Sequence, residues 1–152
     1  MSRKKKLSII FLIIIILFGL YNLFWFVSTR YTYRDYVKAV PKESGAHIQF
    51  DEKKQLTYNV KTPDYLYFTG NLGVSNKEGM VLLIWPSLFG KDFEYGLRIE
   101  NKSEVHEIYI DENLKPVSHE PMQEKIIEDN YEEVKRLYDS AQEKFFRYYN
   151  RK

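Results

Sequence analysis

The side chains that could carry chemistry are spread thinly along this sequence. The three histidines are His47, His106 and His119, and none of them belongs to a helical metal-ligand pair such as HExxH. The chain contains no cysteine, which excludes disulfides, thiolate metal sites and a lipid-modified N-terminal cysteine. We therefore expect no metal ion and no other cofactor.

Hydrolytic chemistry would have to come from carboxylates. Asp64, Glu94 and Glu100 are candidates for glycoside hydrolysis, which uses two carboxyl groups on either side of the scissile bond. No spacing rule selects these three residues, and the sequence contains no serine-nucleophile motif and no phosphate-binding loop. The sequence therefore favours a protein without catalytic activity, with a membrane-anchored hydrolase acting on envelope polymers as the alternative.

Two apolar stretches are candidates for contact with a partner or with a membrane. Leu88 and Phe89 lie in the connection WPSLFG, and an apolar loop of this kind often binds another molecule when it is exposed. Phe146 and Tyr149 lie outside the apolar stripe of the last predicted helix and have arginine and lysine nearby, which suits a membrane surface. The competing interpretation, which the sequence favours, is that these side chains complete the hydrophobic core or belong to a frayed end.

The first element that positions these residues is a predicted membrane-spanning helix. Residues Leu7 to Val27 carry no charge, and a helix of this length spans about 31 Å, close to the hydrocarbon thickness of a bilayer. Four basic residues, Arg3 to Lys6, directly precede it. The positive-inside rule then places the N-terminus in the cytoplasm and residues 28–152 outside the cell membrane.

A cleaved signal peptide is the main alternative to this single-pass anchor. Signal peptides have a shorter apolar region, followed by a cleavage site of small residues. The nearest candidate site, Val27 to Thr29, follows the bulky residues Phe24, Trp25 and Phe26, so we expect an uncleaved signal anchor in contact with the lipid bilayer. The apolar run has one glycine, Gly19, and nothing in it demands helix dimerisation, so the oligomeric state is left open.

The outer part of the chain has the pattern of an α+β domain. Alternating or aromatic-rich segments bounded by turn residues predict six strands, at 47–50, 56–60, 65–72, 80–85, 93–100 and 104–110. Short polar connections between them favour an antiparallel meander of about five to six strands. Residues 80–85 are apolar at every position, which predicts a central strand covered on both faces.

A long C-terminal amphipathic helix is expected to pack against this sheet. Its apolar stripe has seven positions at steps of three and four: Ile127, Tyr131, Val134, Tyr138, Ala141, Phe145 and Tyr148. A coiled coil would show the same spacing, but tyrosine is unusual in a coiled-coil seam. Packing across the sheet is therefore the preferred interpretation.

These elements define an organisation with four parts. They are a basic cytoplasmic head (1–6), a transmembrane anchor (7–27), a juxtamembrane helix or linker (28–46) and an extracytoplasmic domain (47–152). Lys and Arg total 23 against 21 for Asp and Glu, and this balance gives no indication of nucleic-acid binding.

We therefore expect an envelope protein whose outer domain binds a protein, a peptide or a cell-wall component, in an assembly, sensing or immunity-type role. A composition rich in Lys, Glu, Ile and Tyr without cysteine is typical of a low-GC Gram-positive bacterium.

Overall fold

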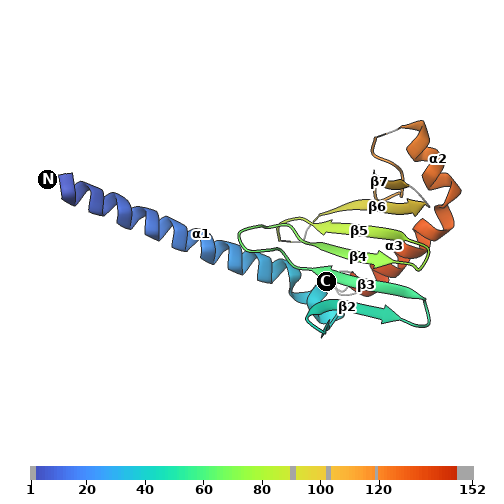
Figure 1. Cartoon of the computed structure of the whole chain (residues 1–152), viewed down its shortest axis with the longest axis horizontal. Helices are drawn as coiled ribbons and strands as arrows, with labels where there is room; N and C mark the ends of the chain where they lie inside the picture. Colours follow the sequence, from blue (N-terminus) through green and yellow to red (C-terminus); the bar gives the residue numbers. More distant parts are fainter. Residues whose placement is uncertain (1–2, 90–91, 102–103, 119, 147–152) are drawn as a thin grey trace.

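The computed structural model describes residues 3–89, 92–101, 104–118 and 120–146. The long helix α1 (Arg3–Ala39) projects from a domain built on one antiparallel sheet (Figure 1). Two further helices, α2 (Pro121–Asp129) and α3 (Tyr131–Phe145), follow the sheet in the chain. The α+β class expected from the sequence is therefore confirmed.

The sheet has seven strands, and their order in space is their order in the chain, with every neighbouring pair antiparallel. The strands are β1 (Lys42–Glu43), β2 (Ala46–Asp51), β3 (Leu56–Lys61), β4 (Asn71–Ser75), β5 (Met80–Pro86), β6 (Phe93–Asn101) and β7 (Glu104–Ile110). The predicted meander is correct, and its strand count is higher than expected because residues 42–43 of the predicted linker pair with β2.

The fourth strand lies further along the chain than the sequence pattern indicated. Of the strand predicted at 65–72, residues 65–70 form a loop, and only Asn71 and Leu72 belong to β4. The register of β4 aligns Leu72 with Val60 and Val74 with Tyr58, which places both apolar side chains in the core. Position 73 of this strand requires glycine, because a Cβ there would lie 2.2 Å from the side-chain oxygen of Asn59. Here glycine marks a close approach between strands and not a turn.

One face of the sheet forms the core, and α3 packs against this face over β4 and β5. The expectation that β5 is covered on both faces is wrong. Its residues alternate, so that Met80, Leu82 and Ile84 are buried whereas Trp85 and its neighbours on the other face are only half-buried. That outer face is protected by its own side chains, since the ring of Trp85 lies over Gly96.

The last three turns of α1 belong to the core of the domain. Tyr33, Tyr36 and Val40 are buried, and Tyr36 has no exposed surface. The Tyr36 ring contacts Phe145 of α3 edge-on, with ring centroids 6.2 Å apart. Pro41 follows directly and ends the helix, since the residue before a proline disfavours the helical conformation. The segment expected as a juxtamembrane helix or linker therefore joins the apolar part of α1 to the sheet as a continuation of the same helix.

The predicted C-terminal helix is divided in two at Asn130. The side-chain amide of Asn130 donates a hydrogen bond of 2.8 Å to the carbonyl of Ile126, and its backbone departs from helical angles. The break changes which side chains face the sheet. Leu137, outside the predicted stripe, is fully buried, whereas Tyr131, inside that stripe, is 44% exposed.

We expect Glu133, at the start of α3, to make the free energy of unfolding depend on pH. The carboxylate accepts hydrogen bonds from the Nε of Arg136 (2.7 Å) and from the Asn76 side chain (2.6 Å). These bonds lower the pKa of Glu133, and the bond from Arg136 has the larger effect. A carboxyl whose folded pKa is below its unfolded pKa stabilises the fold above the unfolded value. This contribution is lost as the pH falls through the folded pKa.

We expect Glu133→Gln to reduce the difference between the urea midpoints measured at about pH 7 and about pH 3. The exposed neighbour Glu132 supplies the control, because no hydrogen bond of its side chain is seen in the described residues. Glu132→Gln should leave the difference close to that of the unchanged chain. Equal effects of the two substitutions would contradict the assignment to Glu133.

Candidate membrane-facing site

Two connections of the sheet lie beside the last turns of the apolar part of α1 (Figure 1). The connection from β3 to β4 is tied to the helix by two hydrogen bonds. The Trp25 indole N–H donates to the carbonyl of Tyr67 (2.6 Å), and the Tyr65 hydroxyl donates to the side-chain oxygen of Asn22 (2.5 Å). These bonds hold an aromatic loop against α1.

Aromatic rings from both connections surround the same turns of α1. The Phe68 ring lies 5.8 Å from Phe24 and 5.9 Å from Tyr21, measured between centroids. The Phe89 ring, in the connection from β5 to β6, lies 6.4 Å from Phe24. We call this group of rings the aromatic collar: Tyr21, Phe24, Trp25, Tyr65, Phe68 and Phe89.

Both loops are anchored to α1 by their backbones as well. The N–H of Gly70 donates to the Tyr33 hydroxyl (2.8 Å), and the N–H of Phe89 donates to the Thr32 hydroxyl (3.1 Å). Burial raises the pKa of Tyr33, although the Gly70 bond opposes this change, so the hydroxyl stays protonated while it accepts the bond. A Cβ on Gly70 would lie 2.1 Å from the carbonyl of Lys61, so only glycine permits this approach.

Each loop holds a large apolar residue in the left-handed backbone region. Leu66 has a φ of 64° and Phe89 a φ of 69°. Large apolar residues rarely adopt this conformation, and such strain of about 1–3 kcal/mol persists only where the surroundings impose it. The positions of these two side chains are therefore set by the contacts with α1 and not by local preference.

The collar lies at the end of the only segment, among the described residues, that is long and apolar enough to span a membrane. The most apolar window of that helix is not buried against any part of the domain. Tyr21 lies about 9 Å along the helix before Val27. In a bilayer, the collar would thus occupy the boundary region where tyrosine and tryptophan are enriched.

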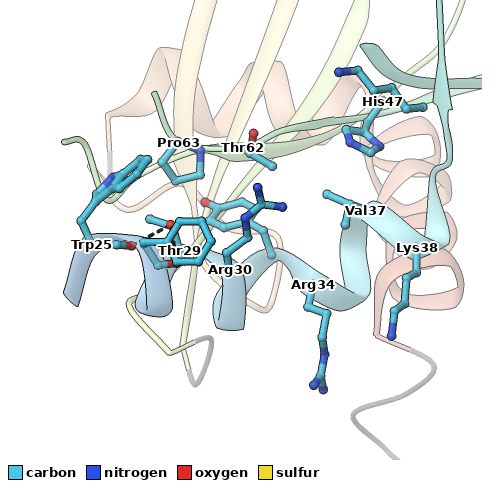
Figure 2. A pocket seen from close by; sticks show the side chains of 12 residues that line it. Trp25, Thr29, Arg30, Arg34, Val37, Lys38, His47, Thr62 and Pro63 are labelled. Atoms are coloured by element: carbon cyan, nitrogen blue, oxygen red, sulfur yellow. Dashed lines mark hydrogen bonds between the residues drawn. The ribbon is translucent and has the colours of Figure 1, made fainter. Parts of the chain in front are cut away.

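A groove of about 710 Å³ continues from the collar along α1. One wall is α1 from Trp25 to Lys38, and the other is formed by His47 and by Thr62 and Pro63 at the end of β3 (Figure 2). The Arg30 side chain rises into the middle of this space, with its guanidinium 5.3 Å from the centroid of the Phe26 ring. We call this space the basic groove, because its charged lining residues are Arg30, Arg34, Lys38 and Lys42.

Two of the three carboxylates considered for catalysis are far apart. Glu94 and Glu100 are six residues apart on β6, which separates them by about 20 Å, too far for a glycosidase pair. Asp64 forms an ion pair with Lys61, with 3.7 Å between nitrogen and oxygen. His47 is in β2 and His106 in β7, at opposite sides of the sheet.

The third histidine, His119, lies outside the described residues, and so does the predicted contact residue Tyr149. Within the part of the chain that is described, no three His, Cys, Asp or Glu side chains form a group able to hold a metal ion.

The other contact candidates from the sequence differ in exposure. Leu88 is 39% and Phe89 44% exposed, so neither is a core residue. Phe146 is 4% exposed and lies against Phe93, with ring centroids 4.5 Å apart, so it offers no surface to a partner. Sequence reasoning identified Phe89 but missed the other two loop aromatics of the collar, Tyr65 and Phe68. The aromatic run directly after Thr62 and Pro63 could have indicated them, but this run has the composition of a strand and was interpreted as one.

Comparison of the chain with protein-family models, curated proteins and solved structures found no match. The arrangement of the collar and the groove is therefore the basis of the functional argument.

Proposed function

We propose that this is a single-pass envelope protein whose domain, on the outer side of the cell membrane, binds a protein, peptide or cell-wall partner close to the bilayer. The observation that carries the proposal is the aromatic collar. Loops distant in the sequence converge on the same turns of α1, where the apolar run ends. A signal sequence removed by cleavage would have no use for such contacts with the mature domain.

The orientation in this proposal rests on charge. Arg3 to Lys6 precede the apolar run without an acidic residue, whereas Asp35 lies among the basic residues that follow it. This asymmetry favours a cytoplasmic N-terminus. The domain that follows α1 then lies outside, in the envelope of a Gram-positive bacterium.

A binding role is supported by the surface that the helices leave open. The outer face of the sheet carries the exposed apolar side chains of Ile48, Phe50 and Tyr109. Ile48 and Phe50 are on β2 and Tyr109 is on β7, so this face has exposed apolar surface near both edges of the sheet, where a partner could bind. A hydrolase acting on envelope polymers finds less support, since two of the three carboxylates considered for it, Glu94 and Glu100, are separated along β6.

The proposal is tested with single cysteines, because the chain has none of its own. Leu88→Cys places a thiol in the collar loop, and Lys53→Cys places one in the exposed turn between β2 and β3, away from α1. In intact protoplasts, a membrane-impermeant maleimide should label Lys53→Cys rapidly and Leu88→Cys at least about tenfold more slowly. The bilayer covers the collar loop, and a buried thiol is neither accessible nor ionised.

Denaturation in concentrated urea is the matched control, since it exposes both thiols and should bring the two labelling rates close together. If Lys53→Cys reacts only after lysis, the domain is inside the cell and the orientation is wrong. Equal rates for the two cysteines in intact protoplasts would show that the collar loop is in water, and the proposed contact with the bilayer would have to be abandoned.

A further inference from the structure

We propose that the basic groove binds the headgroup of an anionic phospholipid. The inference rests on the proposed function, since it requires that α1 span a membrane. It goes further by naming the chemistry that the domain recognises at the bilayer surface, namely a phosphate-bearing headgroup with its acyl chains directed along α1.

The groove has the position that a lipid headgroup requires. It begins at Trp25 and Phe26, just before the end of the apolar run at Val27, and extends along α1 to Lys38. Arg30 is three residues beyond Val27, or about 4.5 Å further along the helix. An acyl chain beside Phe26 would thus bring its headgroup to the level of the Arg30 guanidinium, which Figure 2 shows inside the groove.

The charges of the groove are of one sign and are only partly compensated. The lining contains four basic residues and no acidic residue. Asp35 pairs with Arg34 (3.2 Å) and lies 3.9 Å from Lys38, and Figure 2 shows these two basic side chains directed away from the groove. Arg30 and Lys42 have no carboxylate within ion-pair distance among the described residues. The groove therefore keeps uncompensated positive charge for an anion.

The side chains available in the groove suit phosphate in particular. A guanidinium offers several N–H donors in a plane and binds phosphate oxygens in pairs, and the lysine ammonium adds a mobile charge. The Thr29 hydroxyl is already engaged, since it donates to the carbonyl of Trp25 (2.7 Å). Arg30 is consequently the principal donor inside the groove, and the rings of Trp25 and Phe26 provide the apolar wall.

A second hollow in the molecule is less suited to an anion than the basic groove, because its charges compensate one another. This hollow, on the exposed side of α3, is lined by three basic and four acidic side chains, and each basic side chain pairs with an acidic one. Arg136 is bonded to Glu133, and Lys135 lies 2.6 Å from Asp139. Such paired charges leave little attraction for an added anion. The basic groove differs because its unpaired cations come from separate elements, α1 and β1.

The test uses the full chain reconstituted in vesicles that contain equal amounts of phosphatidylglycerol and phosphatidylcholine. After mild detergent release, native mass spectrometry counts the lipids retained by the protein. The unchanged chain should retain phosphatidylglycerol in preference to phosphatidylcholine. The double variant Arg30→Gln/Lys42→Gln should lower that preference by about tenfold, because two charge-assisted contacts are lost.

The matched control is Lys53→Gln/Lys125→Gln, which removes the same charge from exposed positions away from the groove. This control should keep the lipid preference. An equal loss in both variants would show a general effect of net charge and overturn the site. Displacement of the retained lipid by excess inorganic phosphate would overturn the assignment to a lipid, since a soluble anion would then suffice.

Flotation of the same vesicles separates this inference from the proposed function. A chain that floats with the vesicles but retains both lipids equally would refute the lipid site alone. A chain that does not float would refute the membrane anchor, and the lipid site with it.

Discussion

A chain that begins at Pro41 should fail to fold, whereas one that begins at Ser28 should unfold cooperatively on heating. The shorter chain lacks Tyr33, Tyr36 and Val40, all of which are buried in the core. Truncation of one large buried side chain costs about 2–5 kcal/mol. The sum for three approaches or exceeds the stability of a small domain, which is about 5–15 kcal/mol.

Circular dichroism during a thermal ramp checks this expectation. The chain that begins at Ser28 retains the whole core-facing part of α1 and omits the apolar run, so it also shows whether the domain needs the anchor to fold. A cooperative transition at the same temperature for both chains would contradict the structure, because α1 would then be dispensable for the core.

A charge at Leu137 should unfold the domain, although the sequence pattern directs attention elsewhere on the same helix. Leu137 has no exposed surface and lies on the face of α3 that packs against β4 and β5. An unpaired carboxylate there is strongly disfavoured, and we expect Leu137→Asp to lower the free energy of unfolding by about 4 kcal/mol or more. The urea midpoint of the full chain in detergent micelles measures this change.

Tyr131→Asp is the control for that substitution. Tyr131 belongs to the apolar stripe predicted from the sequence, but it is 44% exposed in the structure. The structure predicts a small loss for Tyr131→Asp, about 1 kcal/mol or less. The opposite ranking, with Tyr131→Asp the more damaging, would favour one continuous helix in place of the break at Asn130.

The parts of the fold that the sequence predicted are those set by neighbouring residues. In β6 the alternation of Tyr95 and Leu97 with polar residues correctly indicates the buried face, because a strand exposes every second side chain. The start of β4 could not be found in this way. Tyr65 and Phe68 are good strand formers, but their partners are on α1, far away in the chain, so local preference was misleading.

Of the candidate site, the sequence indicated only the apolar loop between β5 and β6. Leu88 and Phe89 attract attention because two large apolar residues in a loop are uncommon. The collar requires the additional knowledge that residues 28–40 pack on the sheet, which no local pattern contains. The basic groove was hidden for a similar reason. From the sequence alone, Asp35 offsets the charges of Arg30 and Arg34 alike, whereas in the structure its carboxylate is bonded to Arg34.

The packing of Tyr36 against Phe145 determines the order in which the molecule can assemble. Each strand pairs with the strand next to it in the chain, so the sheet can form hairpin by hairpin, each within about 1–10 μs. Its apolar face is closed by α1, which precedes the sheet, and by α3, which follows it. If α1 anchors the chain, a nascent molecule holds an open sheet beside the bilayer until residues 131–145 have been synthesised and delivered, and core formation is then the last step.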